Sequence, residues 1–216
     1  NSTQIIEPIS ALDLLICKIK DYQQIVYNFG VKTLKKKYPI LKNKESKGIQ
    51  YVVLGPLIQI LNFSYPINEK FDKWNTQLFK NMYGKKGLQN CLYDRYVEIG
   101  RSSIGKMKKR ELEYKSSTLD TYGRIFSPEQ LPKYSSKMSY ICKTIKKSKG
   151  IVLIYSQFID GGCVPLALAL EEMGFKRYGQ NKSLLKNCEA EPLNAHTMDY
   201  KKDGEDFSQA KYIMIT

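Results

Sequence analysis

The feature that most constrains the fold is an apolar run at residues 151–155, IVLIY, which lies between two segments with helical periodicity. The run shows no polar–apolar alternation, as is typical of a strand buried on both faces of a sheet. Helical patterns precede it at 135–148 and follow it at 164–173, and shorter strand-like runs occur at 175–178 and 212–216. This helix–strand–helix–strand order predicts an α/β fold with a parallel sheet.

The first part of the chain has a different pattern. Apolar residues lie mostly on one helical stripe over 10–38, and a second apolar helix is predicted over 51–63. Residues 68–124 have poor periodicity and several glycines, which predicts irregular structure. We therefore expect a helical, basic linker or insertion over 1–124 and an α/β unit over 125–216.

The charge is unevenly distributed. The chain has 35 Lys and Arg against 21 Asp and Glu, a net charge of +14. Residues 1–149 contain 28 basic and 12 acidic side chains (net +16), and residues 150–216 contain 7 and 9 (net −2). A basic excess of this size indicates a polyanionic partner. The abundance of Lys, Asn and Tyr is also what an AT-biased genome would produce.

The cysteines and the histidine argue against several kinds of site. Five cysteines without a CxxC pair indicate a reducing compartment rather than a disulfide scaffold, and a single histidine makes a His/Cys zinc site improbable. No apolar run approaches the length of a membrane span, and no signal peptide is apparent, so we expect a soluble, non-secreted chain. The absence of an initiator Met and the terminal strand-like run indicate a fragment.

A phosphate-binding loop and a catalytic site are both disfavoured by the chemistry of the residues that would form them. Gly100–Lys106 matches GxxxxGK, but Met107 replaces the Ser or Thr that a P-loop needs for Mg²⁺. We therefore expect a basic loop with solvated cations, namely Arg101, Lys106, Lys108, Lys109 and Arg110. The adjacent Glu171 and Glu172 are expected to be solvated helix surface, and His196 is expected to lie in a loop.

Polar residues at the predicted sheet edge form the main candidate site. Ser156 and Gln157 end the predicted strand, and Gly161 and Gly162 begin the next helix, where backbone N–H groups favour anions. Two cations and two hydroxyls begin the preceding helix. The candidate nucleic-acid-binding residues are Lys133, Ser135, Ser136, Lys137, Ser156, Gln157, Gly161 and Gly162. The alternative is that Ser156 and Gln157 only cap the strand.

Four segments carry a resemblance to a known family: KYSSKM at 133–138, IVLIYSQFIDGG at 151–162, ALALEEMGFKRYG at 167–179 and AKYIMIT at 210–216. They resemble the second RecA-like lobe of superfamily 2 helicases, in the branch found in large cytoplasmic DNA viruses. That branch includes the small subunit of the poxvirus early transcription factor and nucleoside triphosphatase I, and it is related to Swi/Snf-type translocases. LIYSQ then corresponds to helicase motif IV. The resemblance implies a partial RecA-like lobe with a parallel sheet.

The resemblance also implies what this chain lacks. The family's P-loop and DExx box lie in the first lobe, and the arginine finger would follow Thr216. The parent would use ATP and Mg²⁺, while this chain alone has no catalytic residues, metal or cofactor and is expected not to hydrolyse ATP. The parent is expected to be a viral helicase or translocase that acts in viral transcription, in the host cytoplasm or virion.

The implied partners are nucleic acid, DNA rather than RNA, the first RecA-like lobe and the viral transcription machinery, with no membrane. Two alternatives stay open. One is a non-enzymatic nucleic-acid-binding or scaffold protein with a degenerate lobe. The other is a protein–protein adaptor whose Lys excess reflects composition, and which would bind oligonucleotides negligibly at low salt.

Overall fold

The computed structural model describes residues 14–38, 51–68, 76–102, 105–179, 183–202, 204 and 206–216. The helices are α1 (Asp21–Lys37), α2 (Tyr51–Asn62), α3 (Thr76–Lys80), α4 (Gly84–Cys91), α5 (Ser116–Tyr122), α6 (Leu131–Tyr134), α7 (Ser136–Ile145) and α8 (Val164–Glu172). A π-helical turn, Ile159–Cys163, leads directly into α8. The strands are β1 (Leu92–Ser102), β2 (Gly105–Tyr114), β3 (Lys176–Arg177) and β4 (Lys211–Tyr212).

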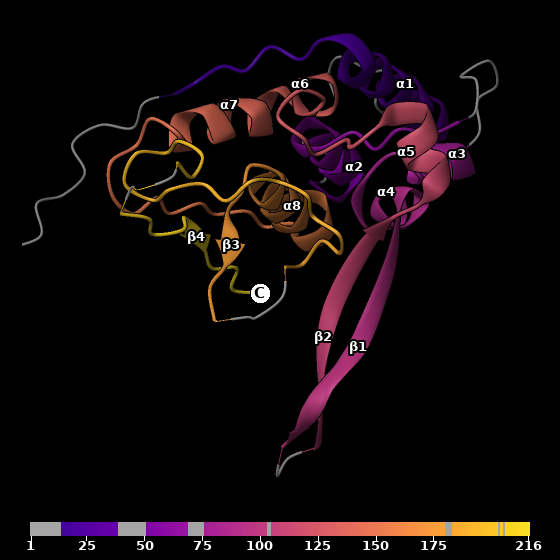
Figure 1. Ribbon diagram of the computed structural model, residues 1–216. Coiled ribbons are helices and arrows are strands. Elements are labelled where there is room, and N and C mark those ends of the chain that lie inside the picture. Colours follow the sequence, from indigo (N-terminus) through magenta and orange to yellow (C-terminus); the bar gives the residue numbers. More distant parts are fainter. Residues whose placement is uncertain are drawn as a thin grey trace, which may run out of the picture.

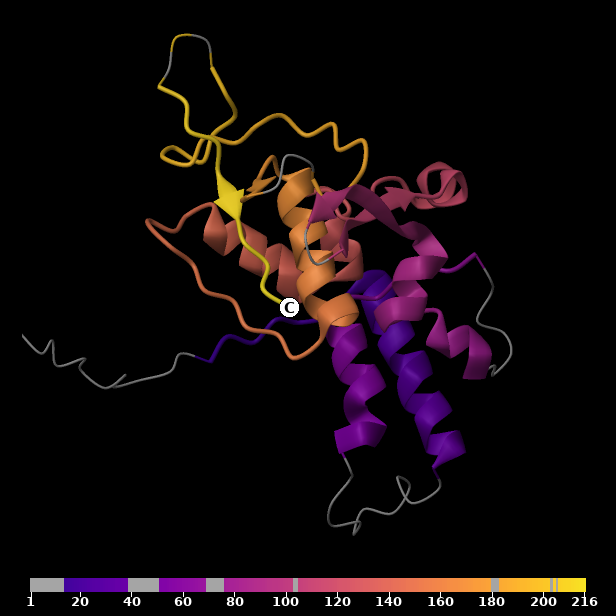
Figure 2. The same cartoon turned by 90° about the horizontal axis from the view of Figure 1, so that it is seen from below.

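The helices form the body of the molecule, and β1 and β2 project from it as a long antiparallel hairpin (Figure 1). Viewed from below, α1 and α2 run side by side, and β3 and β4 lie near one end of α8 (Figure 2). The fold of the described residues is therefore a mixture of helices and strands, with one small parallel pair and one antiparallel pair.

Two clusters of buried side chains hold the body together. The smaller one joins α1, α2 and α3 through residues such as Val26, Ile60 and Phe79. The larger one surrounds α8 and includes Phe63 and Tyr212. This larger core contains residues from both sides of position 124, so it connects the segment before the predicted α/β unit with the unit itself.

Three predicted helices are confirmed. The segments predicted at 51–63, 135–148 and 164–173 form α2, α7 and α8. Local signals set their ends: the Ser135 hydroxyl accepts a hydrogen bond from the Met138 N–H at 3.0 Å, as an N-cap does. After α8, Gly174 has φ +96°, and a Cβ there would lie 2.1 Å from the Glu191 carbonyl oxygen. Only glycine fits this helix end.

The helix predicted over 10–38 is only partly present. Residues 10–13 lie outside the described residues, and 14–20 are extended and pass alongside α7 rather than continuing the helix. The helix begins at Asp21, whose φ of +46° breaks helical continuity with the preceding residues. From there the buried positions Gln23, Val26 and Phe29 follow the predicted stripe.

The prediction of irregular structure over 68–124 is wrong for the described residues from 76 onward. They form α3, α4, the β1–β2 hairpin and α5. The hairpin pairs Leu92 with Tyr114 at its base and Ser102 with Gly105 at its far end, with a register shift between Glu98 and Gly100. Its strands lack polar–apolar alternation because most of their length packs on no core, and the pattern that marks a half-buried strand is therefore absent.

The buried strand predicted at 151–155 is also wrong. These residues form no strand, and no backbone–backbone hydrogen bond in the described part of the chain reaches them. Ile151, Leu153 and Tyr155 are 103%, 95% and 89% exposed. Among the described residues the parallel sheet consists of β3 and β4, which pair Lys176 with Lys211 and Arg177 with Tyr212. The strand predicted at 175–178 is thus present over Lys176–Arg177, whereas of the strand predicted at 212–216 only Tyr212 is paired and residues 213–216 form no strand.

Candidate nucleic-acid interface

Ser135 and Ser136, which the sequence predicts at the start of α7, attach that helix to the body. Ser135 is fully buried, and its hydroxyl donates to the carbonyl of Asn62 while it caps the helix. The backbone N–H of Ser136 donates to the side-chain oxygen of Gln23 at 3.0 Å. These donors are therefore engaged by α1 and α2 and are not directed at a ligand.

The two predicted lysines near α7 are exposed to solvent. The Lys137 ammonium donates to the Asn62 side-chain oxygen at 2.8 Å, and the Lys133 ammonium lies 5.5 Å from the centre of the Tyr134 ring. Neither lysine pairs with a carboxylate in the described part of the chain. Both lysines can therefore contribute positive charge to the binding of a polyanion.

The second predicted group forms a tight turn before α8. The Ser156 hydroxyl contacts the N–H and the carbonyl of Phe158, at 3.3 and 3.2 Å. A Cβ at Gly162 would lie 2.2 Å from that hydroxyl, and one at Gly161 would lie 2.6 Å from the Gln59 side-chain oxygen. Both glycines are buried, so they permit close packing, while Gln157 is exposed.

The two groups are not joined to each other by any hydrogen bond or ion pair among the described residues. Instead the turn before α8 is attached to the interior and to the hairpin. The Tyr65 hydroxyl donates to the Asp160 carbonyl at 3.0 Å, and the Asp160 carboxylate forms an ion pair with Arg110 at 2.7 Å. The predicted site is thus divided, and its second part lies beside the hairpin base.

Arg110 fixes the hairpin to the body. Its guanidinium makes two hydrogen bonds of 2.8 Å to Asp94 on the facing strand, in addition to the ion pair with Asp160. Burial would lower the pKa of Arg110, but the hydrogen bonds to Asp94 and Asp160 outweigh it, so the pKa is raised. Arg110 is therefore a structural cation, and the prediction that it is solvated is wrong.

The outer side of β2 is attached to the chain around residue 185. The Leu112 N–H donates to the Leu184 carbonyl at 2.9 Å, and the Lys186 N–H donates to the Leu112 carbonyl at 2.7 Å. The Lys109 ammonium reaches the Ser183 carbonyl at 2.9 Å, and this side chain is buried. Lys109, like Arg110, is therefore not one of the solvated cations that the sequence predicted.

Beyond these attachments the hairpin extends away from the body (Figure 1). Its register places Glu98 opposite Lys108 and then Arg101 opposite Lys106. Lys108 is exposed. No acidic residue occurs in the sequence between Glu98 and Lys108, so the charged residues between these two positions are cations, while Lys108 itself lies opposite Glu98. We call the residues Arg101, Lys106 and Lys108 the distal cations.

No protein-family model, curated protein or solved structure matches this chain. The resemblance to superfamily 2 helicases accordingly rests on the sequence segments in which it was found.

Glu171 and Glu172 are buried, so the prediction that they form solvated helix surface is wrong. The Glu171 carboxylate accepts the N–H groups of Leu184 and Leu185, both at 2.6 Å, and the Tyr212 hydroxyl at 2.7 Å. All nine residues of α8 are buried. The signal was available in the sequence, because a helix that is apolar on nearly every side is expected to lie inside the fold.

Glu172 connects α8 to the hairpin base. Its carboxylate accepts the Tyr114 hydroxyl at 3.0 Å and pairs with the Arg124 guanidinium at 2.8 Å. The Tyr114 hydroxyl in turn accepts the Phe126 N–H at 3.2 Å. The two glutamates therefore hold β2, β4 and the segment around 185 on the same helix.

Burial of Glu171 predicts a specific pH dependence of stability. Desolvation raises the pKa of Glu171, although the N–H groups of Leu184 and Leu185 and the Tyr212 hydroxyl oppose this. The folded state then binds a proton more readily than the unfolded state, so stability falls as the pH rises above 4.5, its ordinary pKa. Thermal unfolding of the wild type and of Glu171→Gln measures this effect. As the pH rises above 4.5, the unfolding midpoint of the wild type should fall relative to that of Glu171→Gln. A difference independent of pH would contradict the assignment.

The other chemically notable groups do not assemble into a reactive centre. All five cysteines are free, and burial raises the pKa of Cys91 and of Cys142 to about 12, which keeps these thiols protonated near neutral pH. His196 is exposed in a loop. Within the described ranges no group of His, Cys, Asp and Glu could hold a metal ion. The helices described are also too short or too polar to cross a membrane.

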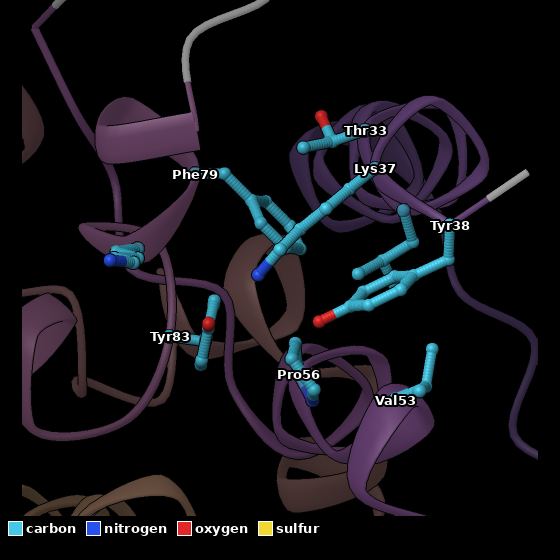
Figure 3. A pocket seen from close by; sticks show the side chains of 9 residues that line it. Thr33, Lys37, Tyr38, Val53, Pro56, Phe79 and Tyr83 are labelled. Atoms are coloured by element: carbon cyan, nitrogen blue, oxygen red, sulfur yellow. The ribbon is translucent and has the colours of Figure 1, made fainter. Parts of the chain in front are cut away.

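The hollow between α1, α2 and α3 is small. Figure 3 shows the Lys37 ammonium and the Tyr38 hydroxyl directed into it, with Phe79, Tyr83 and Pro56 around them. Its volume of about 60 Å³ is far below the roughly 300–1,000 Å³ of typical ligand sites. A larger hollow of about 300 Å³ lies between residues 14–20 and α7, and its lining is mostly apolar. Neither has the polar groups expected of a nucleotide site.

Proposed function

We propose that this chain binds nucleic acid through the phosphate backbone, with the distal cations of the hairpin as the principal contact. The observation that carries the proposal is that these three residues belong to the part of the hairpin that projects from the body, while Arg110 fixes the base of the hairpin. The exposed Lys133, Lys137 and Gln157 are the members of the predicted site that can add polar contacts.

The arrangement of charge favours an anionic partner. Arg101 and Lys106 occupy directly opposed positions in the hairpin, and like charges opposite one another destabilise a strand pair. A phosphate bound at this end would relieve that repulsion. Because phosphate contacts carry no sequence information, the binding is expected to be salt-dependent and independent of sequence.

The wider role that we propose follows from the sequence resemblance. In that interpretation the chain contributes a phosphate grip in the second RecA-like lobe of a viral ATP-dependent helicase or translocase that acts in viral transcription. ATP and Mg²⁺ would be bound by the family's P-loop and DExx box. The distal cations, Lys133, Lys137 and Gln157 would bind the phosphates of the nucleic-acid strand. The sequences of the segments at 133–138, 167–179 and 210–216 support this interpretation.

Reversing the charge of the distal cations tests the binding proposal. The variant Arg101→Glu/Lys106→Glu/Lys108→Glu is compared with Lys143→Glu/Lys147→Glu/Lys149→Glu, which changes three exposed lysines on and after α7. Both variants lower the net charge of +14 by 6, to +8. We expect the hairpin variant to bind an oligonucleotide of about 16 nucleotides at least tenfold more weakly. A plot of log affinity against log salt concentration should also be less steep for the hairpin variant. The slope should decrease in magnitude by about 2, because each of the three lost phosphate contacts contributes about 0.7 on a single strand.

The control variant separates local contacts from overall charge. If the two variants lose affinity equally, the hairpin has no special role. If the wild type binds no oligonucleotide at about 50 mM salt, the proposal is wrong and the adaptor alternative gains support. Circular dichroism of each variant establishes that the fold is retained.

A further inference from the structure

Tyr96 occupies an unusual position on the hairpin. Side chains on one face alternate along β1 as Asp94, Tyr96 and Glu98, opposite Leu112, Arg110 and Lys108 on β2. From the body outward this face begins with the buried Leu112 and continues with the Arg110–Asp94 pair. Tyr96 comes next and is 67% exposed. It lies at the boundary between the fixed base and the cationic end.

The ring of Tyr96 is available, whereas that of its neighbour on the strand is occupied. The Tyr93 ring has the Arg95 guanidinium at 4.9 Å and the Lys115 ammonium at 5.6 Å. Tyr96 makes no ring contact, cation contact or side-chain hydrogen bond within the described part of the chain. The guanidinium of Arg110, which faces Tyr96 across the strands, is held by Asp94 and Asp160 instead.

We propose that Tyr96 stacks on an unpaired base, so that the hairpin binds single-stranded nucleic acid in preference to duplex. This inference rests on the proposed function and specifies its substrate. A tyrosine on a paired strand loses little conformational freedom when a base stacks on it, and every base offers a π-face. In a duplex these faces are covered by neighbouring bases, so the ring gains nothing there.

The spacing of the hairpin suits this mode of binding. Arg110, opposite Tyr96, and Lys106, opposite Arg101, are four residues apart on β2. Four residues of strand span roughly 13 Å. A single strand of nucleic acid running along this face would place a base on Tyr96. Its successive phosphates would then lie near Lys108 and near the paired positions Arg101 and Lys106. This combination of a cationic track and an aromatic platform is characteristic of single-strand binding.

The test compares single-stranded and duplex DNA of equal length at low salt by fluorescence anisotropy. Tyr96→Ala should bind the single strand about tenfold more weakly, within the range measured for loss of one stacked base, and should bind duplex nearly as the wild type does. Tyr96→Phe, which keeps the ring, should retain full affinity. Tyr178→Ala is the matched control, because Tyr178 is 61% exposed but lies beyond β3, off the hairpin. Inorganic polyphosphate, which has no bases, should bind Tyr96→Ala and the wild type equally.

The outcomes distinguish this inference from the proposed function. If Tyr96→Ala binds the single strand as the wild type does while the distal-cation variant binds weakly, the phosphate contact stands and the stacking role is overturned. Equal losses on single strand, duplex and polyphosphate would also overturn it, since they would indicate a general disturbance of the hairpin. If the wild type binds none of these probes, both proposals fail together.

Discussion

Replacing Phe63 with alanine is expected to lower the free energy of unfolding by about 3–5 kcal/mol, the usual cost of truncating a fully buried aromatic residue. Phe63 is completely buried, and its ring centre lies 4.7 Å from that of Tyr65 and 4.8 Å from that of Phe126. Tyr134 stacks on it at 6.2 Å. Chemical denaturation monitored by far-UV circular dichroism measures the loss.

Phe63→Leu provides the control for this prediction. Leucine retains most of the buried apolar area but loses the ring contacts, which are worth about 0.5–1.5 kcal/mol each beyond burial. Its cost should therefore lie clearly below that of alanine. An alanine variant that loses less than about 1 kcal/mol would show that Phe63 is not a centre of the core.

Arg110→Ala is expected to cost about 3 kcal/mol, because it leaves the Asp94 carboxylate buried without its cation. The Asp94 side chain is only 5% exposed, whereas that of Asp160 is 21% exposed and can regain some solvation. The loss should shrink when Asp94→Asn is added, since the buried charge is then removed as well. A double-mutant cycle over the two positions measures this coupling.

Arg95→Ala on the facing strand is the matched control. Its guanidinium lies 3.8 Å from Glu113, but its side chain is 59% exposed, so the loss should be under about 1 kcal/mol. Similar losses for Arg95→Ala and Arg110→Ala would contradict the assignment of Arg110 as the hairpin anchor. Arg110→Ala should also weaken single-strand binding, because the distal cations are then no longer fixed relative to the body.

The parts of the fold that the sequence predicted are those set by neighbouring residues. α7 follows from the Ser135 cap and the apolar spacing of Met138 and Cys142, all within one segment. β3 lies within the strand predicted at 175–178, while the strand predicted at 212–216 overlaps β4 only at Tyr212. The sequence does not predict the hairpin because the described positions 95–98 of β1 are exposed and show no alternation. The attachment of Arg110 depends on Asp160, which no local pattern connects to it.

In the candidate site, too, the features set by neighbouring residues could be predicted and those set by distant contacts could not. Lys133 and Lys137 were predicted as exposed cations near a helix start, and they are exposed. Ser135 has the sequence features of a ligand-binding hydroxyl, but the packing of α7 against α2 directs it to the Asn62 carbonyl. Tyr96 carried no signal in the sequence, because one tyrosine among 16 becomes notable only when its neighbours' rings are seen to be occupied.

The contact between Tyr65 and Asp160 also has a consequence for biosynthesis. These residues are 95 positions apart, and Tyr65 is a member of the larger core. At about 5–20 residues per second, a ribosome needs roughly 5–20 s to produce the intervening chain. During that time Phe63 and Tyr65 have no completed core to enter. The first half of this protein is therefore expected to be a substrate for chaperones while it is still being translated.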